Sequence, residues 1–335
     1  MRNILLDRHH SDLYYGLQLL FEDRLHWAAF APLGMEWYDA GYWAFDVPSD
    51  PGALARQYLT IDAKYREVEP GLYLTFDPGH PERPLWHVSL ERARGMGWHA
   101  AMASVQQNQP GYRRFADETG AAYLYHIGNA RQQVSWELDP LALVAAEAPI
   151  VGRGILVGEE FDSDTTFRYR PPVTTHEIAS FVNLLPLIEE LWPTYLAAGR
   201  LLPDFTFRSF GHSCPDGNLQ PTASVAEQMA RSGWGWHDKV TGDGFGHVIH
   251  GWAAVGRPLI GHSEYYAGQR AAALWEDGVT CVDLSVHPLD EAAGLIREVS
   301  ADPERHEAMC RAIRDRFDSL YDWQADAAAV AEALR

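Results

Sequence analysis

The residue pattern best suited to chemistry in this sequence is a glycine-rich turn at residues 242–246, which reads GDGFG. Glycines let a backbone approach a ligand closely and take positive φ where a tight turn needs it. The apolar run at residues 246–255 predicts a helix, whose first N–H groups and positive dipole end suit a phosphate. Three nearby side chains could add charge-assisted hydrogen bonds, namely His237, Lys239 and His247. A tight turn with no ligand gives the same pattern, so the turn alone leaves binding open.

The elements around this turn are those of an α/β domain. Short apolar stretches predict buried strands at residues 205–210, 258–261 and 281–284. Helical spacing of apolar residues predicts helices at residues 224–232, 246–255 and 288–300, and a last one from about 303 to a break near 321–323. Strands that alternate with helices favour a doubly wound parallel sheet. Ligands bind such sheets beyond the carboxyl ends of the strands.

The amino-terminal half predicts a second sheet of the same kind. It opens with an apolar run at residues 4–6 and a helix expected over residues 11–21. Further strands are expected at residues 121–125 and 155–157, with a helix at 110–119. One long helix over residues 175–199, after a break at residues 170–172 (RPP), is expected to connect the two halves.

Length and charge narrow the class of protein. The chain has 335 residues, enough for two ordinary domains, with 47% hydrophobic and 22% charged residues, as in folded soluble proteins. The net charge of −19 disfavours nucleic acid as a partner, because nucleic-acid binding draws on lysines and arginines. The three cysteines show no CxxC spacing, and neither a signal peptide nor an apolar run of about 20 residues is read. We expect a cytoplasmic protein without membrane insertion.

The glycine-rich segment resembles the donor-binding signature of GT-B superfamily glycosyltransferases, especially retaining enzymes of the glycogen-synthase and sucrose-synthase type. Residues 243–246 (DGFG) and 256–260 (GRPLI) match that signature with no gap between them, and residues 276–281 (EDGVTC) resemble its next stretch. The resemblance covers about residues 236–284. It implies an α/β protein of the GT-B fold, with two Rossmann-like doubly wound domains facing across a cleft. The implied activity is transfer of a sugar from a nucleoside-diphosphate sugar to a hydroxyl acceptor.

The resemblance also implies a division of the chain. The expected parts are an acceptor-side domain at 1–175, a connector at 176–202, a donor-binding domain at 203–318 and a helix at 319–335 that crosses back to the first domain. UDP-sugar is the expected donor, and no other cofactor is implied.

Individual roles follow from the same resemblance. Asp243 stands where the family carries its first glutamate, so it is a candidate catalytic carboxylate. Gly251 replaces the second glutamate, which typically holds the donor ribose, and His250 lies beside it. The residues expected to bind the donor are His237, Lys239, Gly244, Phe245, Gly246, His247, His250, Tyr265, Tyr266 and Gln269.

A general base is expected in the first half of the chain. His9 follows the first strand, where inverting GT-B enzymes that act on small molecules keep a histidine base for the acceptor hydroxyl. Glu36 is a second candidate, because it lies in an aromatic segment at residues 34–43 that suits a binding loop. A polar loop with solvated histidines would give the same pattern. The expected acceptor-side residues are His10, Trp37, His126 and Asn129.

Two spacings could hold a metal ion, and we expect neither to do so. His247 and His250 lie three residues apart on one helix face, without a third ligand at suitable spacing. Asp162 and Asp164 form a DxD triplet, which GT-A transferases use for manganese, but the chain order here is that of two successive α/β domains. Transfer without a metal is therefore expected.

Three other functions fit the same residues. They are a nucleotide-sugar epimerase, a nucleotide-sugar-binding protein without catalysis, and a phage-type enzyme that glycosylates a modified pyrimidine in DNA. A basic groove would mark the last of these, and the net charge of −19 argues against one.

Overall fold

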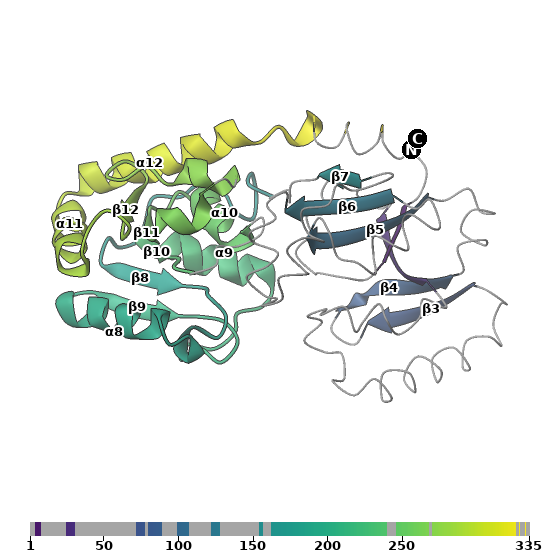
Figure 1. Cartoon of the computed structure of the whole chain (residues 1–335), viewed down its shortest axis with the longest axis horizontal. Coiled ribbons are helices and arrows are strands. Elements are labelled where there is room, and N and C mark those ends of the chain that lie inside the picture. Colours follow the sequence, from purple (N-terminus) through teal and green to yellow (C-terminus); the bar gives the residue numbers. More distant parts are fainter. Residues whose placement is uncertain are drawn as a thin grey trace, which may run out of the picture. The chain divides into compact units, whose positions relative to one another are not determined.

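The structure is a computed structural model of the chain (Figure 1). It describes the backbone of seven strands in the amino-terminal half, at residues 4–7, 25–30, 72–77, 80–88, 99–106, 122–127 and 154–156. It also describes residues 162–239, 246–267, 270–325, 328 and 332. Contacts divide the chain into two compact units, one made of Met1–Glu160 with Trp323–Arg335 and the other of Phe161–Asp322.

The first unit contains a seven-stranded sheet with the order β3-β4-β2-β1-β5-β6-β7. Its strands are β1 (Ile4–Asp7), β2 (Leu25–Phe30), β3 (Leu72–Asp77), β4 (His80–Val88), β5 (His99–Gln106), β6 (Ala122–Ile127) and β7 (Gly154–Leu156). All neighbouring pairs are parallel except β3 and β4. The strands expected at residues 4–6, 121–125 and 155–157 are confirmed as β1, β6 and β7.

The second unit contains a five-stranded parallel sheet with the order β12-β11-β10-β8-β9. Its strands are β8 (Glu177–Ser180), β9 (Thr206–Ser209), β10 (Trp234–Trp236), β11 (Leu259–Gly261) and β12 (Cys281–Asp283). Strand β8 comes first along the chain. Strand β9 lies on one side of it, and β10, β11 and β12 lie in order on the other side. This is the doubly wound order 2-1-3-4-5, whose switch point lies between β8 and β10.

Five α-helices surround this sheet in the part of the chain that the structure describes. They are α8 (Leu191–Leu201), α9 (Thr222–Arg231), α10 (His247–Ala254), α11 (Leu289–Ala301) and α12 (Pro303–Leu320). The strands at 205–210, 258–261 and 281–284 and the helices at 224–232, 246–255, 288–300 and from 303 are confirmed within a few residues. The expected break after the last helix is confirmed too, since α12 ends at Leu320.

The continuous helix expected over residues 175–199 is wrong. That segment forms the buried strand β8, a short 3-10 turn at Leu185–Leu187 and then α8. Leu184 takes a left-handed φ of 61° just before the turn, and Pro186 lies within it. These two features end any regular helix between the strand and α8, although the apolar spacing alone favours one.

The side chains of β10 show which helices cover each face of this sheet. Trp234 and Trp236 of β10 are fully buried in a core that also contains Tyr195 of α8 and Ile296 of α11. Gly235 lies between them, and a Cβ on it would be 2.5 Å from the ring of Trp252 in α10. Because alternate residues of a strand point to opposite faces, α10 covers the face opposite to α8 and α11.

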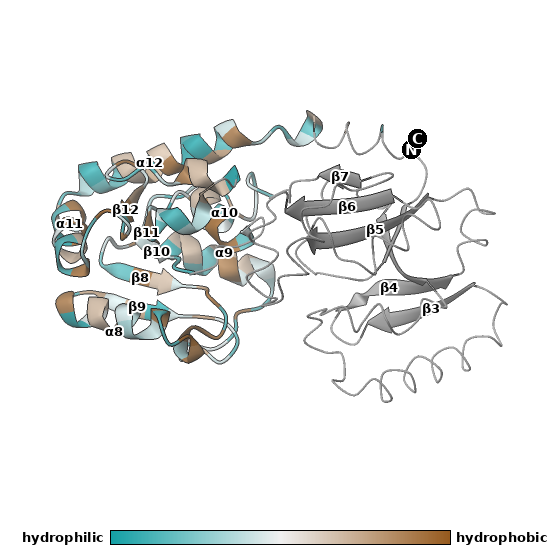
Figure 2. Ribbon diagram, in the orientation of Figure 1, coloured by the Kyte–Doolittle hydropathy of each residue, from teal (hydrophilic) through white to brown (hydrophobic). Residues whose placement is uncertain are grey.

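Helix α12 borders both groups of helices, since it contacts α10 and α11. Asp302 caps its first turn, accepting hydrogen bonds from the amides of Glu304 and Arg305 at 3.1 Å each. Hydrophilic and hydrophobic residues alternate along it (Figure 2), as expected of a helix with one side on the core. None of the described helices is long and apolar enough to cross a membrane. The three cysteines are buried free thiols.

A buried arginine donates hydrogen bonds to carbonyls at the carboxyl ends of two helices, α9 and α10. Arg257 is fully buried and directly follows the turn that ends α10. Its Nη1 donates to the carbonyls of Val255 at 2.9 Å and Gly256 at 2.8 Å, and its Nη2 donates to Arg170 at 2.6 Å and to Ala230 near the end of α9. Burial lowers the pKa of the guanidinium. The charge thus satisfies carbonyls that the helix ends leave without partners.

We expect Arg257→Leu to lower the free energy of unfolding by about 3 kcal/mol or more, because it leaves several buried carbonyls without donors. Arg305→Leu is the matched control: this guanidinium is 47% exposed, 3.9 Å from Glu298. Its loss should change stability by about 0–1 kcal/mol. Urea denaturation followed by circular dichroism measures both. Equal midpoints for the two variants would contradict the role given to Arg257.

Candidate functional site

The carboxyl edge of the second sheet gathers the polar residues that follow its strands. His237, Asp238 and Lys239 follow β10, His262 follows β11, and Asp283 ends β12. This edge lies beside the switch point between β8 and β10, which is where open α/β sheets bind ligands. Helix α10 also begins at this edge, because it leaves β10 and returns to the amino end of β11.

The amino end of α10 follows a glycine at the carboxyl edge of the sheet. Gly246 precedes the helix in a left-handed conformation, with φ of 82° and ψ of 56°, which favours glycine. No described side chain caps this end. The first backbone amides and the positive dipole end therefore suit an anion, as expected from the sequence. Asp243, Gly244 and Phe245 lie outside the described residues.

Two strand ends approach each other closely at this edge. A Cβ on Gly261, the last residue of β11, would be 2.3 Å from the carbonyl oxygen of His237. His237 is buried, and its ring lies 6.0 Å from that of Tyr266. Lys239 is half-buried, two residues further along the chain. Glycine is therefore required at the end of β11 for the chain after β10 to hold this position.

An Asp–His pair joins the loops after β10 and β11. Nδ1 of His262 lies 2.7 Å from Oδ1 of Asp238, whose side chain is 1% exposed. The hydrogen bond that Nδ1 donates to Asp238 raises the pKa of His262. Asp283 fixes the same loop, because its Oδ1 accepts from the amides of Ser263 at 3.0 Å and Ser285 at 2.8 Å.

Asp238, His262 and Asp283 were not among the site residues expected from the sequence. A positional signal could have identified them, since each lies at or just after the end of a buried strand in a sheet that binds ligands there.

The two tyrosines after β11 have different surroundings. Tyr265 is half-buried, and its ring lies 5.0 Å from that of His262. Tyr266 is fully buried and stacks on Trp275 at 5.2 Å. Both were expected to contact the donor sugar, and that role stays a prediction.

Both ring nitrogens of His250 are engaged inside the protein. The residue is fully buried, with Nδ1 2.9 Å from the carbonyl of Gly246 and Nε2 in a short hydrogen bond with the hydroxyl of Tyr321. The guanidinium of Arg270 lies 4.6 Å from the centre of the Tyr321 ring. His250 thus connects the first turn of α10 to the residue that follows α12. His247 lies in the same first turn, with its ring 6.2 Å from that of Phe167.

Gly251 faces the interior of the second unit. A Cβ there would lie 3.1 Å from Sδ of Met229 and 3.3 Å from the ring of Phe167. The glutamate of the resembling family has no room at this position. The ribose contact that the resemblance implies for this position is therefore not available here.

Neither candidate metal pair has a third ligand among the described residues, where no group of three histidine, cysteine, aspartate or glutamate side chains could hold an ion. The carboxylate of Asp162 instead orders a turn. It accepts hydrogen bonds from the amide of Thr165 at 3.1 Å and from the hydroxyl of Thr166 at 2.7 Å.

Most acceptor-side predictions lie outside the described residues. This holds for His9, His10, Glu36, Trp37 and Asn129, and for Gln269 of the donor set. His126 lies in β6, of which the backbone is described. Their roles stay predictions.

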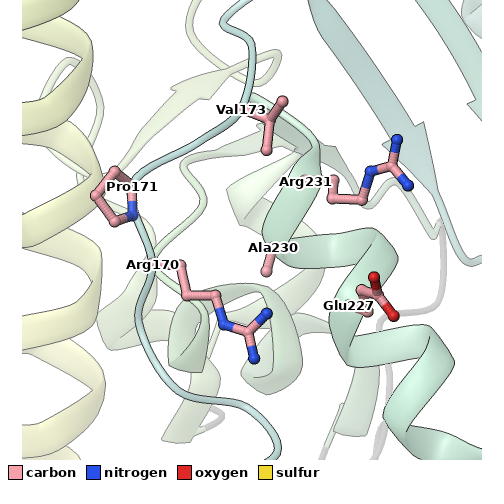
Figure 3. A pocket seen from close by; sticks show the side chains of 6 residues that line it. All are labelled: Arg170, Pro171, Val173, Glu227, Ala230 and Arg231. Atoms are coloured by element: carbon pink, nitrogen blue, oxygen red, sulfur yellow. The ribbon is translucent and has the colours of Figure 1, made fainter.

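A surface hollow of about 380 Å³ lies away from this edge (Figure 3). It is lined by Arg170, Pro171, Val173, Glu227, Ala230 and Arg231. Arg231 ends α9, which runs back from the carboxyl end of β9 to the amino end of β10. The hollow therefore lies at the amino edge of the sheet, opposite to the candidate site.

The whole chain resembles solved glycosyltransferase structures in its fold. HepE of Anabaena in complex with UDP-glucose is 13% identical, with 100% of this chain and 99% of that chain covered and a TM-score of 0.58. Sucrose-phosphate synthase of Thermosynechococcus elongatus is 13% identical, with 99% and 98% covered and a TM-score of 0.57. An α-glucosyltransferase in complex with UDP-glucose and DNA is 9% identical, with 99% and 98% covered and a TM-score of 0.54.

These structures define the fold class. Their cover of the full chain, together with two largely parallel sheets, shows the α/β architecture of GT-B glycosyltransferases that the sequence predicts. No protein-family model and no curated protein sequence matches the chain.

We expect Gly251→Glu to destabilise the protein rather than supply the missing carboxylate, because it buries a charge against Met229 and Phe167. The expected loss is about 3 kcal/mol or more. Gly251→Ala adds one methyl group at 3.1 Å from a flexible methionine and should cost less. Thermal unfolding of the two variants measures which of them loses more stability. A Gly251→Glu protein as stable as the wild type would show that the helix can turn this position towards solvent.

Proposed function

We propose that the chain is a glycosyltransferase that moves a hexosyl or pentosyl group from a nucleoside-diphosphate sugar to a hydroxyl acceptor, without a metal. The observation that carries the proposal is that α10 begins, after Gly246 in a left-handed conformation, at the carboxyl edge of a sheet of order 2-1-3-4-5. The fold shared with HepE, which was solved with UDP-glucose, supports UDP-sugar as the donor.

The proposed chemistry follows from the electrostatics of this edge. As the bond between the sugar and the diphosphate breaks, negative charge grows on the leaving oxygen. The dipole end of α10 and the ammonium of Lys239 would stabilise that charge in place, before it has to be solvated by water. His247 lies in the same first turn as a further donor. No separate cofactor is part of this proposal.

The residues proposed to bind and deprotonate the acceptor are taken from the sequence. His9 or Glu36 would take the proton of the acceptor hydroxyl if the reaction inverts the anomeric centre. If it retains configuration, the departing phosphate can accept that proton and Asp243 would face the sugar. His10, Trp37, His126 and Asn129 would shape the acceptor pocket. A cytoplasmic location fits a supply of nucleotide sugar.

The proposed function predicts release of a nucleoside diphosphate in a donor screen. UDP, GDP, ADP and TDP are first tested for thermal stabilisation, because a ligand that binds only the native state raises the melting temperature. The matching nucleotide sugars are then tested with mixed hydroxyl acceptors, and release of the diphosphate is measured. Stabilisation without any release would favour a binding protein. Interconversion of the sugar without release would favour an epimerase. No stabilisation by any of the four at millimolar concentration would refute the donor site.

Lys239→Ala should raise the Kd of the diphosphate by roughly 10- to 100-fold, because a charge-assisted contact to phosphate is worth about 1.5–3 kcal/mol. Arg200→Ala is the control. It removes one positive charge from the last turn of α8, at the amino edge of the sheet. Isothermal titration calorimetry measures both variants. Equal diphosphate affinities of the two variants would show that Lys239 does not contact the diphosphate.

A further inference from the structure

A buried carboxylate at the candidate site has an incomplete set of partners. Asp238 is the second residue after β10, and its side chain is 1% exposed. Its Oδ1 bonds to Nδ1 of His262 at 2.7 Å, and its buried Oδ2 meets no donor among the described residues. A buried carboxylate is costly unless an opposite charge compensates it. His262 is the group placed to do so.

The pairing with Asp238 therefore favours the imidazolium form of His262. The carboxylates that act on it are those of Asp238, Glu264 and Asp283, and the hydrogen bond that Nδ1 donates to Asp238 raises its pKa. Its side chain is 24% exposed, and its Nε2 makes no hydrogen bond to a described residue. The neighbouring ring of Tyr265, 5.0 Å away and tilted by 33°, limits its rotation. In its imidazolium form, His262 thus keeps one N–H donor available to a ligand.

The fold places this donor at the same sheet edge as the proposed diphosphate site. His262 directly follows β11, and α10 is the helix that connects β10 to β11. The imidazole and the amino end of α10 therefore share the carboxyl edge of the sheet. The remaining charged groups on these loops are mainly acidic, and the chain as a whole carries −19. An anionic ligand needs local cations at such an edge.

We propose that Nε2–H of His262 binds a phosphate oxygen of the nucleotide-sugar donor, and that Asp238 is the positioning residue that fixes the ring and its charge. The proposal rests on the proposed function and adds the group that this edge recognises. A sugar hydroxyl would need no fixed positive charge, whereas a diphosphate gains a charge-assisted bond from one. Asp238 acts only through His262.

The test compares His262→Gln with a matched histidine. His287 is also paired with carboxylates, but both its nitrogens are engaged, Nε2 with Asp277 at 2.7 Å and Nδ1 with Glu291 at 3.2 Å. Calorimetry gives the Kd of whichever of UDP, GDP, ADP and TDP binds most tightly, and of its free nucleoside. His262→Gln should raise the diphosphate Kd about 10-fold or more and leave the nucleoside Kd unchanged. His287→Gln should change neither.

Asp238→Asn separates positioning from a purely structural role. Without the carboxylate, the pKa of His262 should fall, which NMR titration of the ring proton measures. Because the imidazolium is the binding form, affinity falls as pH rises through the pKa of His262. The Asn variant should therefore lose diphosphate affinity at pH 7.5 and recover towards the wild type at pH 6. Circular dichroism checks that each variant is folded, and His262→Gln carries the test if Asp238→Asn is not.

The outcomes distinguish this inference from the function on which it rests. If the wild type binds a diphosphate and the His262→Gln variant binds it with the same Kd, only the proposed phosphate contact is overturned. Equal losses for nucleoside and diphosphate also overturn it, because the ring would then support the base pocket or the fold. Failure of the wild type to bind any of the four diphosphates refutes the proposed function, and the inference with it.

Discussion

The contact between Gly235 of β10 and Trp252 of α10 sets the geometry on which the candidate site depends. A side chain at residue 235 would push the helix away, since even a Cβ would lie 2.5 Å from the indole. This close packing holds α10 against β10, and the chain order places the amino end of α10 at the carboxyl edge of the sheet. The two tryptophans that flank the glycine fill the other face of the sheet. One strand of three residues thus orients both layers of helices.

Buried charge is distributed over the two edges of this sheet in different ways. At the amino edge, the charge of Arg257 is compensated by four backbone carbonyls that accept from its two Nη atoms, while its buried Nε has no partner among the described residues. At the carboxyl edge, Asp238 has one imidazole partner and a second oxygen without one among the described residues. Carbonyls that already compensate the charge of Arg257 in the free protein suit a structural role. The pair of Asp238 and His262 instead lies at the edge where a ligand can add to its bonding.

The sequence predicts the second sheet well because its strands are short apolar runs bounded by glycine, proline or charge. It predicts β8 wrongly because the surrounding apolar spacing is helical, and only pairing with β9 and β10 makes residues 177–180 a strand. It misses β10 because a glycine between two tryptophans has no strand period. The amino end of α10 is predicted from glycine chemistry, whereas Asp238 and His262 become partners only when parallel pairing brings the ends of two strands together.

The replacement of a carboxylate by Gly251 changes what α10 contributes to the protein. Its middle turn packs on Met229 and Phe167, and His250 beside it bonds to Tyr321, where the chain leaves α12. The contact-based boundary between the two units follows one residue later, after Asp322. The first turn of α10 therefore carries both the amides proposed to bind phosphate and the carbonyl of Gly246 that holds His250. One helix therefore carries both the proposed donor contacts and the anchor of the segment that leads out of the second unit.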